Sequence, residues 1–241
     1  MTQFFSLLKL GDKGWGDEIF FGFCLTLALA LCTLPIGLFI GLMVALAKDS
    51  GNWLLAFLSN IYTTLFRALP ELLTILIVYY GGQIALKRFV SWVVGVEVDL
   101  QVNGFVAGMV ALGLVLGAFS GEVWLGALKA IPKGQREGAH ALGLSRFKCF
   151  HLVVFPQLVR LALPGLGNNW MSLLKDTSLV SVIALTDLMY ISNTAVRNNP
   201  SYSFQFYLLC CILYLVMAYS SNQIINWLEK YSNRSLPRAR T

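Results

Sequence analysis

Two long stretches without a charged residue constrain the fold of this chain more than any other feature of its sequence. They cover residues 19–47 and 198–228. A helix of about 20 apolar residues crosses the hydrocarbon layer of a membrane, so each stretch is long enough to span it. The first stretch is also longer than the apolar region of a secretory signal, which has about 7 to 15 residues. We therefore predict that both are membrane spans and that the first is retained.

Three further spans are expected between these two. Residues 54–86 carry only Arg67 and Glu71 as charges, and residues 100–128 carry only Glu122. For the remaining span two frames compete: residues 149–166 are more apolar, whereas residues 164–186 include Lys175 and Asp176. Either frame gives five spans, and the predicted fold class is all-α and integral to the membrane.

The sequence offers little support for catalysis or metal binding. The five cysteines form no C-x-x-C pair, and His140 and His151 are eleven positions apart without a neighbouring ligand set. No G-x-S-x-G or H-E-x-x-H pattern occurs, which argues against an intramembrane hydrolase. We expect no catalytic residue, no metal and no bound cofactor.

The distribution of lysine and arginine predicts the orientation, because cytoplasmic loops are enriched in both. With the N-terminus outside, ten of these residues lie in inner segments and five in outer ones. The excess favours a periplasmic N-terminus and a cytoplasmic C-terminus. It also explains the net charge of +6 without invoking nucleic acid. The inner residues are Lys48, Lys129, Lys133, Arg136, Arg146, Lys148, Lys230, Arg234, Arg238 and Arg240, and the outer ones are Lys9, Lys13, Lys87, Arg88 and Arg197.

Glycines recur at four-residue spacing in two of the predicted spans. The first span has the pair Gly37 and Gly41, and the third includes the pair Gly117 and Gly121. Small residues at this spacing let helix backbones approach closely in a membrane. We expect packing within one subunit, with a dimer interface as the alternative.

A charged, glycine-punctuated block separates the third span from the fourth. Residues 130–156 read AIPKGQREGAHALGLSRFKCFHLVVFP. Pro132 should end the preceding helix, a short helix is expected over residues 135–142, and Gly143 is suited to a left-handed cap. Ser145 can cap the next helix, which Pro156 should interrupt or bend. The alternative is an ordinary solvated loop that follows the positive-inside rule.

The spacing within this block resembles the EAA loop of ABC importer permeases. That pattern is E-A-A-x3-G-x9-I-x-L-P, and here Glu137, Gly143 and Pro156 stand at its fixed positions while Gly138 replaces an alanine. The segments AIPKGQR, LPGLGNN and LLKDTSLVS resemble one branch, the polar amino acid uptake permeases. The likeness covers nearly the whole chain and implies the type I importer permease fold, also called MetI-like.

The resemblance implies a coupling role for this block. In the family the loop forms a helix that docks on a cytoplasmic ATPase subunit, so Glu137 and Gly143 would be docking residues, with Ala139 and Leu142 on the groove-facing side. The chain has no G-x-x-x-x-G-K-[ST] run, so ATP is expected to bind a partner. The implied partners are a second, similar permease, two copies of the ATPase and a periplasmic solute-binding protein, all acting at the bacterial inner membrane.

The family also favours 164–186 as the fourth span, with the spans then covering residues 19–47, 54–86, 100–128, 164–186 and 203–229. Lys175 and Asp176 would lie roughly 16 Å into that helix at 1.5 Å per residue, near mid-membrane. Adjacent residues on a helix cannot pair with each other, so each needs another partner. A structural ion pair between helices and a place in the translocation path are equally open.

Three more charged residues are candidates for the translocation path. Arg67 and Glu71 lie four positions apart, where they can form a pair, while an acidic residue after Pro70 resembles permeases for histidine, other basic amino acids and opines. Glu122 lacks the arginine that many relatives carry three positions later, where Leu125 stands here. Either another chain supplies a cation or Glu122 faces the cavity.

The sequence thus predicts the permease subunit of an ATP-driven importer for a polar, basic amino acid or opine. The alternative is a secondary transporter that uses an ion gradient, with Glu71, Glu122, Lys175 and Asp176 relaying protons. An inverted repeat in the sequence would favour such a transporter, but the sequence displays none. An EAA loop would also have no role in it.

Overall fold

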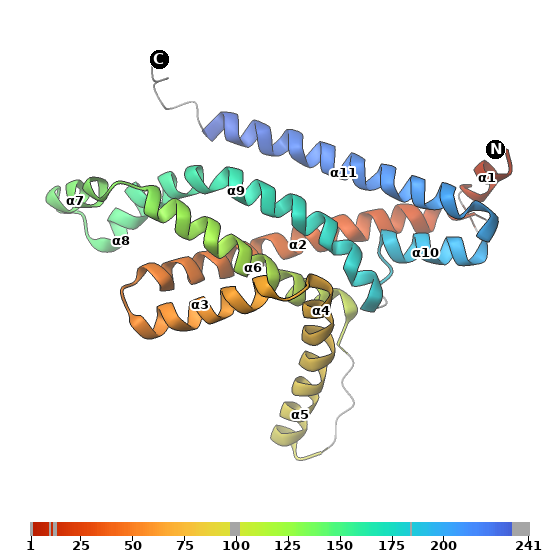
Figure 1. Ribbon diagram of the computed structural model, residues 1–241, viewed down its shortest axis with the longest axis horizontal. Helices are drawn as coiled ribbons and strands as arrows, with labels where there is room; N and C mark the ends of the chain where they lie inside the picture. The colour runs from red at the N-terminus through yellow and green to blue at the C-terminus, as the bar shows by residue number, and fades with distance from the viewer. Residues whose placement is uncertain (1, 10, 12–13, 97–101, 184, 233–241) are drawn as a thin grey trace.

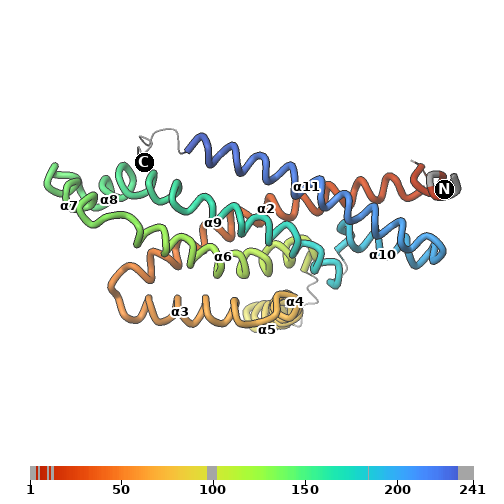
Figure 2. The backbone as a smooth tube through the Cα atoms, turned by 45° about the horizontal axis from the view of Figure 1, so that its top comes forward, coloured from red at the N-terminus to blue at the C-terminus, as the bar shows by residue number. Residues whose placement is uncertain are grey.

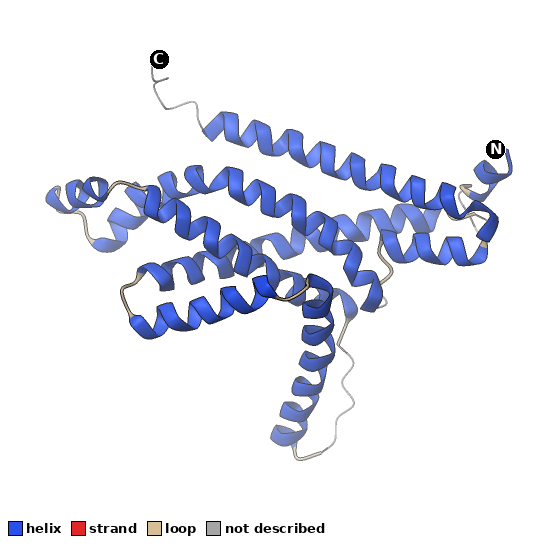
Figure 3. Cartoon of the chain, in the orientation of Figure 1, coloured by secondary structure: helices blue, strands red, loops and turns tan. Residues whose placement is uncertain are grey.

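The computed structural model describes residues 2–9, 11, 14–96, 102–183 and 185–232, and its elements are helices joined by short loops (Figure 3). Five helical stretches among these residues are long and apolar enough to cross a membrane. The number and type of predicted spans are therefore confirmed. The five stretches are Gly16–Asp49, Glu71–Val94, Gly104–Ala130, Arg146–Ile183 and Pro200–Ser232. The basic residues Lys13, Arg234, Arg238 and Arg240 and the first two residues of the predicted third span lie outside the described residues.

The first and third spans form the centre of a bundle. Helix α2 (Gly16–Asp49) lies beside α6 (Gly104–Ala130), with α9 (Phe155–Asp176) against α6 (Figure 1). A Cβ atom on Gly37 would come within 2.5 Å of Leu116, so α2 and α6 meet through their glycines. The structure shows that these glycines pack helices of one subunit against each other, as the favoured interpretation predicted.

The second predicted span is broken. Helix α3 (Trp53–Ala68) ends before Leu69, whose backbone is extended at φ −83° and ψ 145°, and a new helix begins after Pro70. Proline disfavours the helical conformation in the residue before it, which explains the break. The uninterrupted span over residues 54–86 was therefore wrong.

After this break the chain leaves the bundle. Helix α4 (Glu71–Leu76), the π-helical turn η1 (Ile77–Gly81) and α5 (Gly82–Val94) run on as one stretch. This stretch projects away from the long axis of the bundle and is seen nearly end-on in Figure 2. Its start stays close to α6, which places the first residue of α4 beside the bundle.

The fourth span contains the whole of the frame 149–166 and the frame 164–186 as far as Ile183. Helix α8 (Arg146–Cys149), the π-helical turn η2 (Phe150–Val154), α9 and the 3₁₀ segment η3 (Thr177–Ile183) follow one another without a loop. Pro156 is the second residue of α9 and directly follows the π-helical turn η2, whereas Pro164 lies inside α9 and does not begin it. The start of the fourth span at Pro164 was thus wrong, because packing against α6 and the last helix holds α9 together through that proline.

The charged block forms two short helices at one end of the molecule. Helix α7 covers Lys133–Ala141, and Gly143 after it has φ +78°, the left-handed cap that its position predicted. The backbone N–H of Lys148 donates to the hydroxyl of Ser145 at 3.4 Å, so Ser145 caps α8. The block is therefore a structured element and not an irregular loop.

Three helices were not anticipated from the sequence. Helix α1 (Thr2–Leu7) precedes the first span, α3 is separate from α4, and α10 (Leu188–Asn198) lies between the last two spans. Asp187 caps α10 by accepting a hydrogen bond from the N–H of Tyr190 at 2.9 Å. The last helix, α11 (Ser203–Ser232), then runs back along the bundle towards the end that carries α7 (Figure 1).

Candidate functional site

A small polar pocket lies where α4, α6 and α9 meet. It has a volume of about 50 Å³, enough for a few water molecules in this conformation. Four aliphatic side chains form part of its wall, and five polar or aromatic residues complete it. The lining residues are Glu71, Leu112, Val115, Leu116, Phe119, Asn169, Ser172, Leu173 and Asp176.

Two carboxyl groups meet in this pocket, at the ends of two helices. Glu71 is the first residue of α4, and Asp176 is the last residue of α9. Both side chains line the pocket, where the two carboxyl groups interact with each other. Two ionised carboxylates this close repel, and a cation between them relieves the repulsion. This part of the pocket is therefore suited to a cationic group.

A hydrogen-bond donor lines the same pocket. The amide nitrogen Nδ2 of Asn169 is buried, and within the described part of the chain it has no hydrogen-bond partner. Asn169 precedes Asp176 by seven positions, roughly 10 Å along a helix at 1.5 Å per residue. The pocket therefore combines an unused donor with two carboxyl groups.

Lys175 does not join this pocket. Its side chain is exposed and borders a separate cavity of about 350 Å³ between α9, α10 and α11, which includes Tyr207 and Tyr214. Adjacent residues on a helix point about 100° apart, so Lys175 and Asp176 face different surroundings. Of the two candidates in the fourth span, only Asp176 lines the pocket with Glu71.

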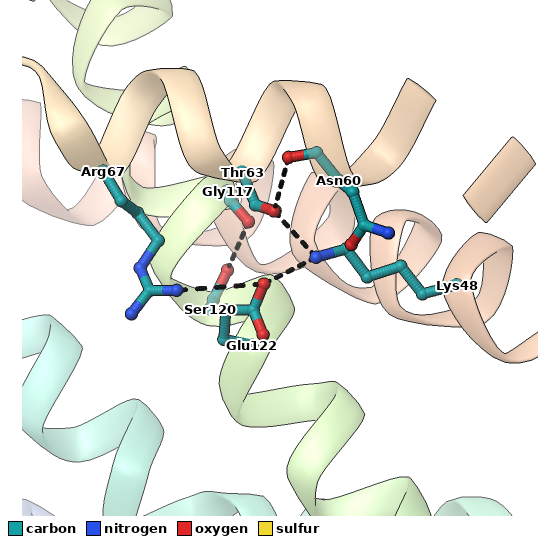
Figure 4. A network of polar contacts seen from close by, with 7 residues as sticks. All are labelled: Lys48, Asn60, Thr63, Arg67, Gly117, Ser120 and Glu122. Atoms are coloured by element: carbon teal, nitrogen blue, oxygen red, sulfur yellow. Dashed lines mark hydrogen bonds and ion pairs between the residues drawn. The ribbon is translucent and has the colours of Figure 1, made fainter. Parts of the chain in front are cut away.

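Glu122 and Arg67 belong to a second polar cluster, shown in Figure 4. The ammonium nitrogen of Lys48 lies 2.6 Å from Oε1 of Glu122 and donates to Oγ1 of Thr63 at 2.7 Å. Nη1 of Arg67 lies 3.8 Å from the same Oε1. We refer to Lys48, Thr63, Arg67 and Glu122 as the charge cluster.

This cluster corrects two expectations. The proposed pair of Arg67 with Glu71 does not form: the break at Pro70 separates the two residues, and Arg67 pairs with Glu122. The cation that Glu122 lacks on its own helix comes from α2 of the same chain, and not from another subunit. No sequence signal indicated Lys48, because it lies 74 positions from its partner.

The coupling candidates on α7 divide between two faces. Glu137 is exposed, and Leu142 is 83% exposed. Ala139 is only 5% exposed and packs into the core of its own chain. Its placement on the groove-facing side was therefore wrong, because the small Ala139 side chain faces the chain's own helices, whereas Leu142 is accessible.

Asn169, Ser172 and Phe119 are the pocket residues that the sequence analysis missed. One signal could have revealed two of them, since positions 169, 172 and 176 share one face of a helix at spacings of three and four. Within the described residues, no three His, Cys, Asp or Glu side chains come together as a possible metal site.

Comparison with known proteins identifies the family. The sequence pattern of the family described as "Binding-protein-dependent transport system inner membrane component" matches residues 37–234. The chain belongs to this permease family. It is thus a membrane component of an ABC importer, which decides for the ATP-driven system over the ion-gradient alternative.

Two relatives of the permease match it over almost their whole length. The nopaline transport system permease protein NocQ of Agrobacterium fabrum is 36% identical, with 96% of this chain and 98% of the relative covered. The histidine/lysine/arginine/ornithine transport system permease protein HisQ of Escherichia coli is 37% identical, with 94% and 98% covered. Both are permease subunits of transport systems for amino acids or opines.

Solved structures of amino acid transporters resemble the permease in fold. A chain of a crystal structure described as an amino acid ABC transporter with histidines has a TM-score of 0.74 and 26% identity, and the match covers 90% of the permease and 95% of that chain. A chain of the MetNI methionine ABC transporter in an inward-facing conformation has a TM-score of 0.60 at 16% identity, with 93% and 97% covered. The type I importer permease fold is therefore confirmed.

Proposed function

We propose that this permease moves a basic amino acid or an opine across the inner membrane, and that Glu71 and Asp176 bind its cationic group. The observation that carries the proposal is the pairing of these two carboxyl groups inside a pocket of a membrane permease. Ionisable side chains within a membrane are costly and most often serve the transported solute. Histidine, lysine, arginine, ornithine and nopaline, named in the descriptions of the relatives, all contain basic groups.

The donor at Asn169 supports a substrate with two separated charges. Its free Nδ2 can donate to a carboxylate, while the carboxyl pair takes the cation. A separation of roughly 10 Å between Asn169 and Asp176 suits a long basic side chain. In a neutral amino acid the ammonium and carboxylate groups are adjacent. The present pocket is smaller than such a substrate, so the surrounding helices must move apart to admit it.

Energy would come from ATP hydrolysis in a separate subunit that docks on α7. Leu142 and Phe147 are 83% and 77% exposed at this end of the molecule, next to the exposed Glu137. Exposed apolar side chains beside a carboxylate suit a protein partner better than water. The complete transporter would contain a second homologous permease, two ATPase subunits and a periplasmic solute-binding protein.

The arrangement of the helices supports a periplasmic N-terminus and a cytoplasmic C-terminus. Helix α7 lies at one end of the bundle, with the end of α11 towards that side, whereas α1 and α10 lie at the opposite end (Figure 1). If α7 meets a cytoplasmic ATPase, then α1 is periplasmic. The excess of lysine and arginine in the inner segments agrees with this orientation.

Replacing Glu71 with Gln tests the substrate class. The variant keeps the shape of the side chain and removes the charge, so uptake of a basic amino acid should fall about tenfold or more, while a neutral amino acid is less affected. Asp176→Asn should act in the same direction. Glu18→Gln, at an exposed position near the start of α2, is the matched control and should leave uptake unchanged. Equal losses for both substrate classes would assign Glu71 a purely structural role.

A further inference from the structure

Phe119 lines the pocket on α6. Helix α6 runs towards α7, and the lining residues Leu112, Val115, Leu116 and Phe119 follow one another along it in that direction. Phe119 is the last of them. Among the lining residues of α6, Phe119 is therefore the one nearest to α7 along the helix.

An arginine holds this ring from outside the pocket. Cζ of Arg67 lies 5.6 Å from the centroid of the Phe119 ring, the geometry of a cation–π contact. The same guanidinium reaches Glu122, which stands about one helical turn beyond Phe119 on α6. Arg67 is the penultimate residue of α3, and Glu71 of the pocket follows four positions later. The contact thus joins α3 to a residue that lines the pocket.

Glu122 is itself fixed by a buried cation. The side chain of Lys48 is 6% exposed, and its ammonium group bonds to both Glu122 and Thr63. The Glu122 side chain is 33% exposed, so the pair is partly buried, and removing Glu122 would leave the buried ammonium group of Lys48 without a counter-charge. Lys48 lies at the end of α2, and its neighbour Asp49 contacts Arg136 of α7 at 3.3 Å. Motion of α7 therefore reaches the charge cluster through two adjacent residues.

We propose that the charge cluster positions Phe119 as the cytoplasmic floor of the pocket and so links the movement of α7 to the release of substrate. Lys48 and Glu122 act as positioning residues without touching the substrate. The proposal rests on the function assigned above. When α7 moves, the end of α2 moves with it, Glu122 and Arg67 rearrange, and the ring of Phe119 leaves the exit. While the cluster is intact, ATP hydrolysis and passage of the substrate stay coupled.

The decisive readout is the amount of substrate taken up per ATP hydrolysed, measured with the complete transporter in proteoliposomes. Glu122→Gln should lower this ratio about 3- to 10-fold, as expected for a residue that carries coupling between two sites. Phe119→Ala should do the same. In the Phe119→Ala background, Glu122→Gln should not lower the ratio further, because both changes act through the ring of Phe119. If the double variant lowers the ratio by the product of the two single decreases, the proposal is overturned.

Two conservative changes separate positioning from folding. Lys48→Arg keeps a cation for Glu122 and should preserve the ratio, whereas Lys48→Met should lower it. Arg67→Lys keeps the charge but loses the planar contact with the ring, and should also lower the ratio. If the Glu122→Gln transporter does not assemble, the Arg67→Lys variant still tests the proposal. An unchanged ratio of uptake to ATP hydrolysis in Arg67→Lys would overturn it.

The two proposals can fail separately. If the wild-type transporter carries only neutral amino acids, the proposed substrate class is wrong. The ratio can still be measured with the neutral substrate. If basic amino acids are carried and the ratio is unaffected by Glu122→Gln, the positioning role is wrong and the substrate class stands.

Discussion

Oδ2 of Asp49 lies 3.3 Å from Nη1 of Arg136 and accepts its hydrogen bond. The contact joins the last residue of α2 to helix α7. It is partly exposed, with 31% and 38% of the two side chains accessible. Such a pair contributes little to stability, so its position matters more than its strength.

Breaking this pair should affect transport more than folding. Asp49→Asn should lower the free energy of unfolding by at most about 1 kcal/mol, the usual upper value for an exposed pair. Uptake should fall, because α7 loses a direct connection to α2. Thermal unfolding and uptake are measured for Asp49→Asn, Arg136→Gln and the double variant. Uptake by the double variant should be no lower than uptake by either single variant. If the loss of uptake in the double variant equals the product of the two single losses, the two residues act independently.

Gly138 should accept an alanine. A Cβ atom there would have no neighbour within 4 Å, and the position lies inside α7. Glycine inside a helix costs roughly 0.5–1 kcal/mol relative to alanine, so Gly138→Ala should stabilise α7 by that amount. Circular dichroism and thermal unfolding of the variant measure the gain, and a loss of stability would contradict the packing described here.

An alanine at Gly143, just after α7, should have the opposite effect to an alanine at Gly138. Its φ of +78° lies in the left-handed region, which costs an L-residue roughly 1–2 kcal/mol. Gly143→Ala should therefore destabilise the turn after α7, although a Cβ atom would meet no neighbour within 4 Å. Equal effects of alanine at positions 138 and 143 would refute the assigned cap.

The glycine interface between α2 and α6 should tolerate no added side chain. A Cβ atom on Gly117 would lie 2.7 Å from Ile40 and 2.7 Å from the hydroxyl of Tyr62. Gly117→Val should lower the free energy of unfolding by about 1–3 kcal/mol, the usual cost of overpacking. Gly126→Ala on the same helix meets open space and serves as the control. A stable Gly117→Val variant would be incompatible with this close approach.

The sequence predicted what depends on local chemistry. Long apolar stretches determine the spans, Gly143 and Ser145 determine the turn and cap after α7, and the EAA spacing indicates the family. What depends on distant contacts was missed or wrong. Lys48 and Glu122 are far apart in the chain, and only the packing of α2 on α6 brings them together. The wrong start of the fourth span has the same cause, since tertiary contacts keep α9 helical through Pro164.

A buried carboxyl group outside the spans should make stability depend on pH. Asp187 is fully buried, its Oδ2 has no hydrogen-bond partner within the described residues, and burial raises the pKa of Asp187 to about 6. An unfolded aspartate has a pKa near 3.9, so the folded state holds the proton more tightly. Stability is then greatest at low pH and falls as the pH rises from about 4 to about 6.

Asp187→Asn isolates this effect. Asparagine can still cap α10 but does not ionise, so the variant should gain stability relative to the wild type above pH 6, by up to about 3 kcal/mol at 1.36 kcal/mol per pKa unit. The difference in unfolding free energy between the two proteins is measured from pH 4 to pH 8. A difference that does not change with pH would show that Asp187 is not the titrating group.

Reconstitution of the purified permease with and without its partners tests the central claim most directly. Uptake of a labelled basic amino acid is measured in proteoliposomes that contain the complete transporter, with its binding protein and ATP on the appropriate sides. We predict uptake that requires ATP hydrolysis and is abolished by Glu137→Lys, which reverses an exposed charge on α7. Uptake by the permease alone, driven by an ion gradient without ATP, would contradict the account.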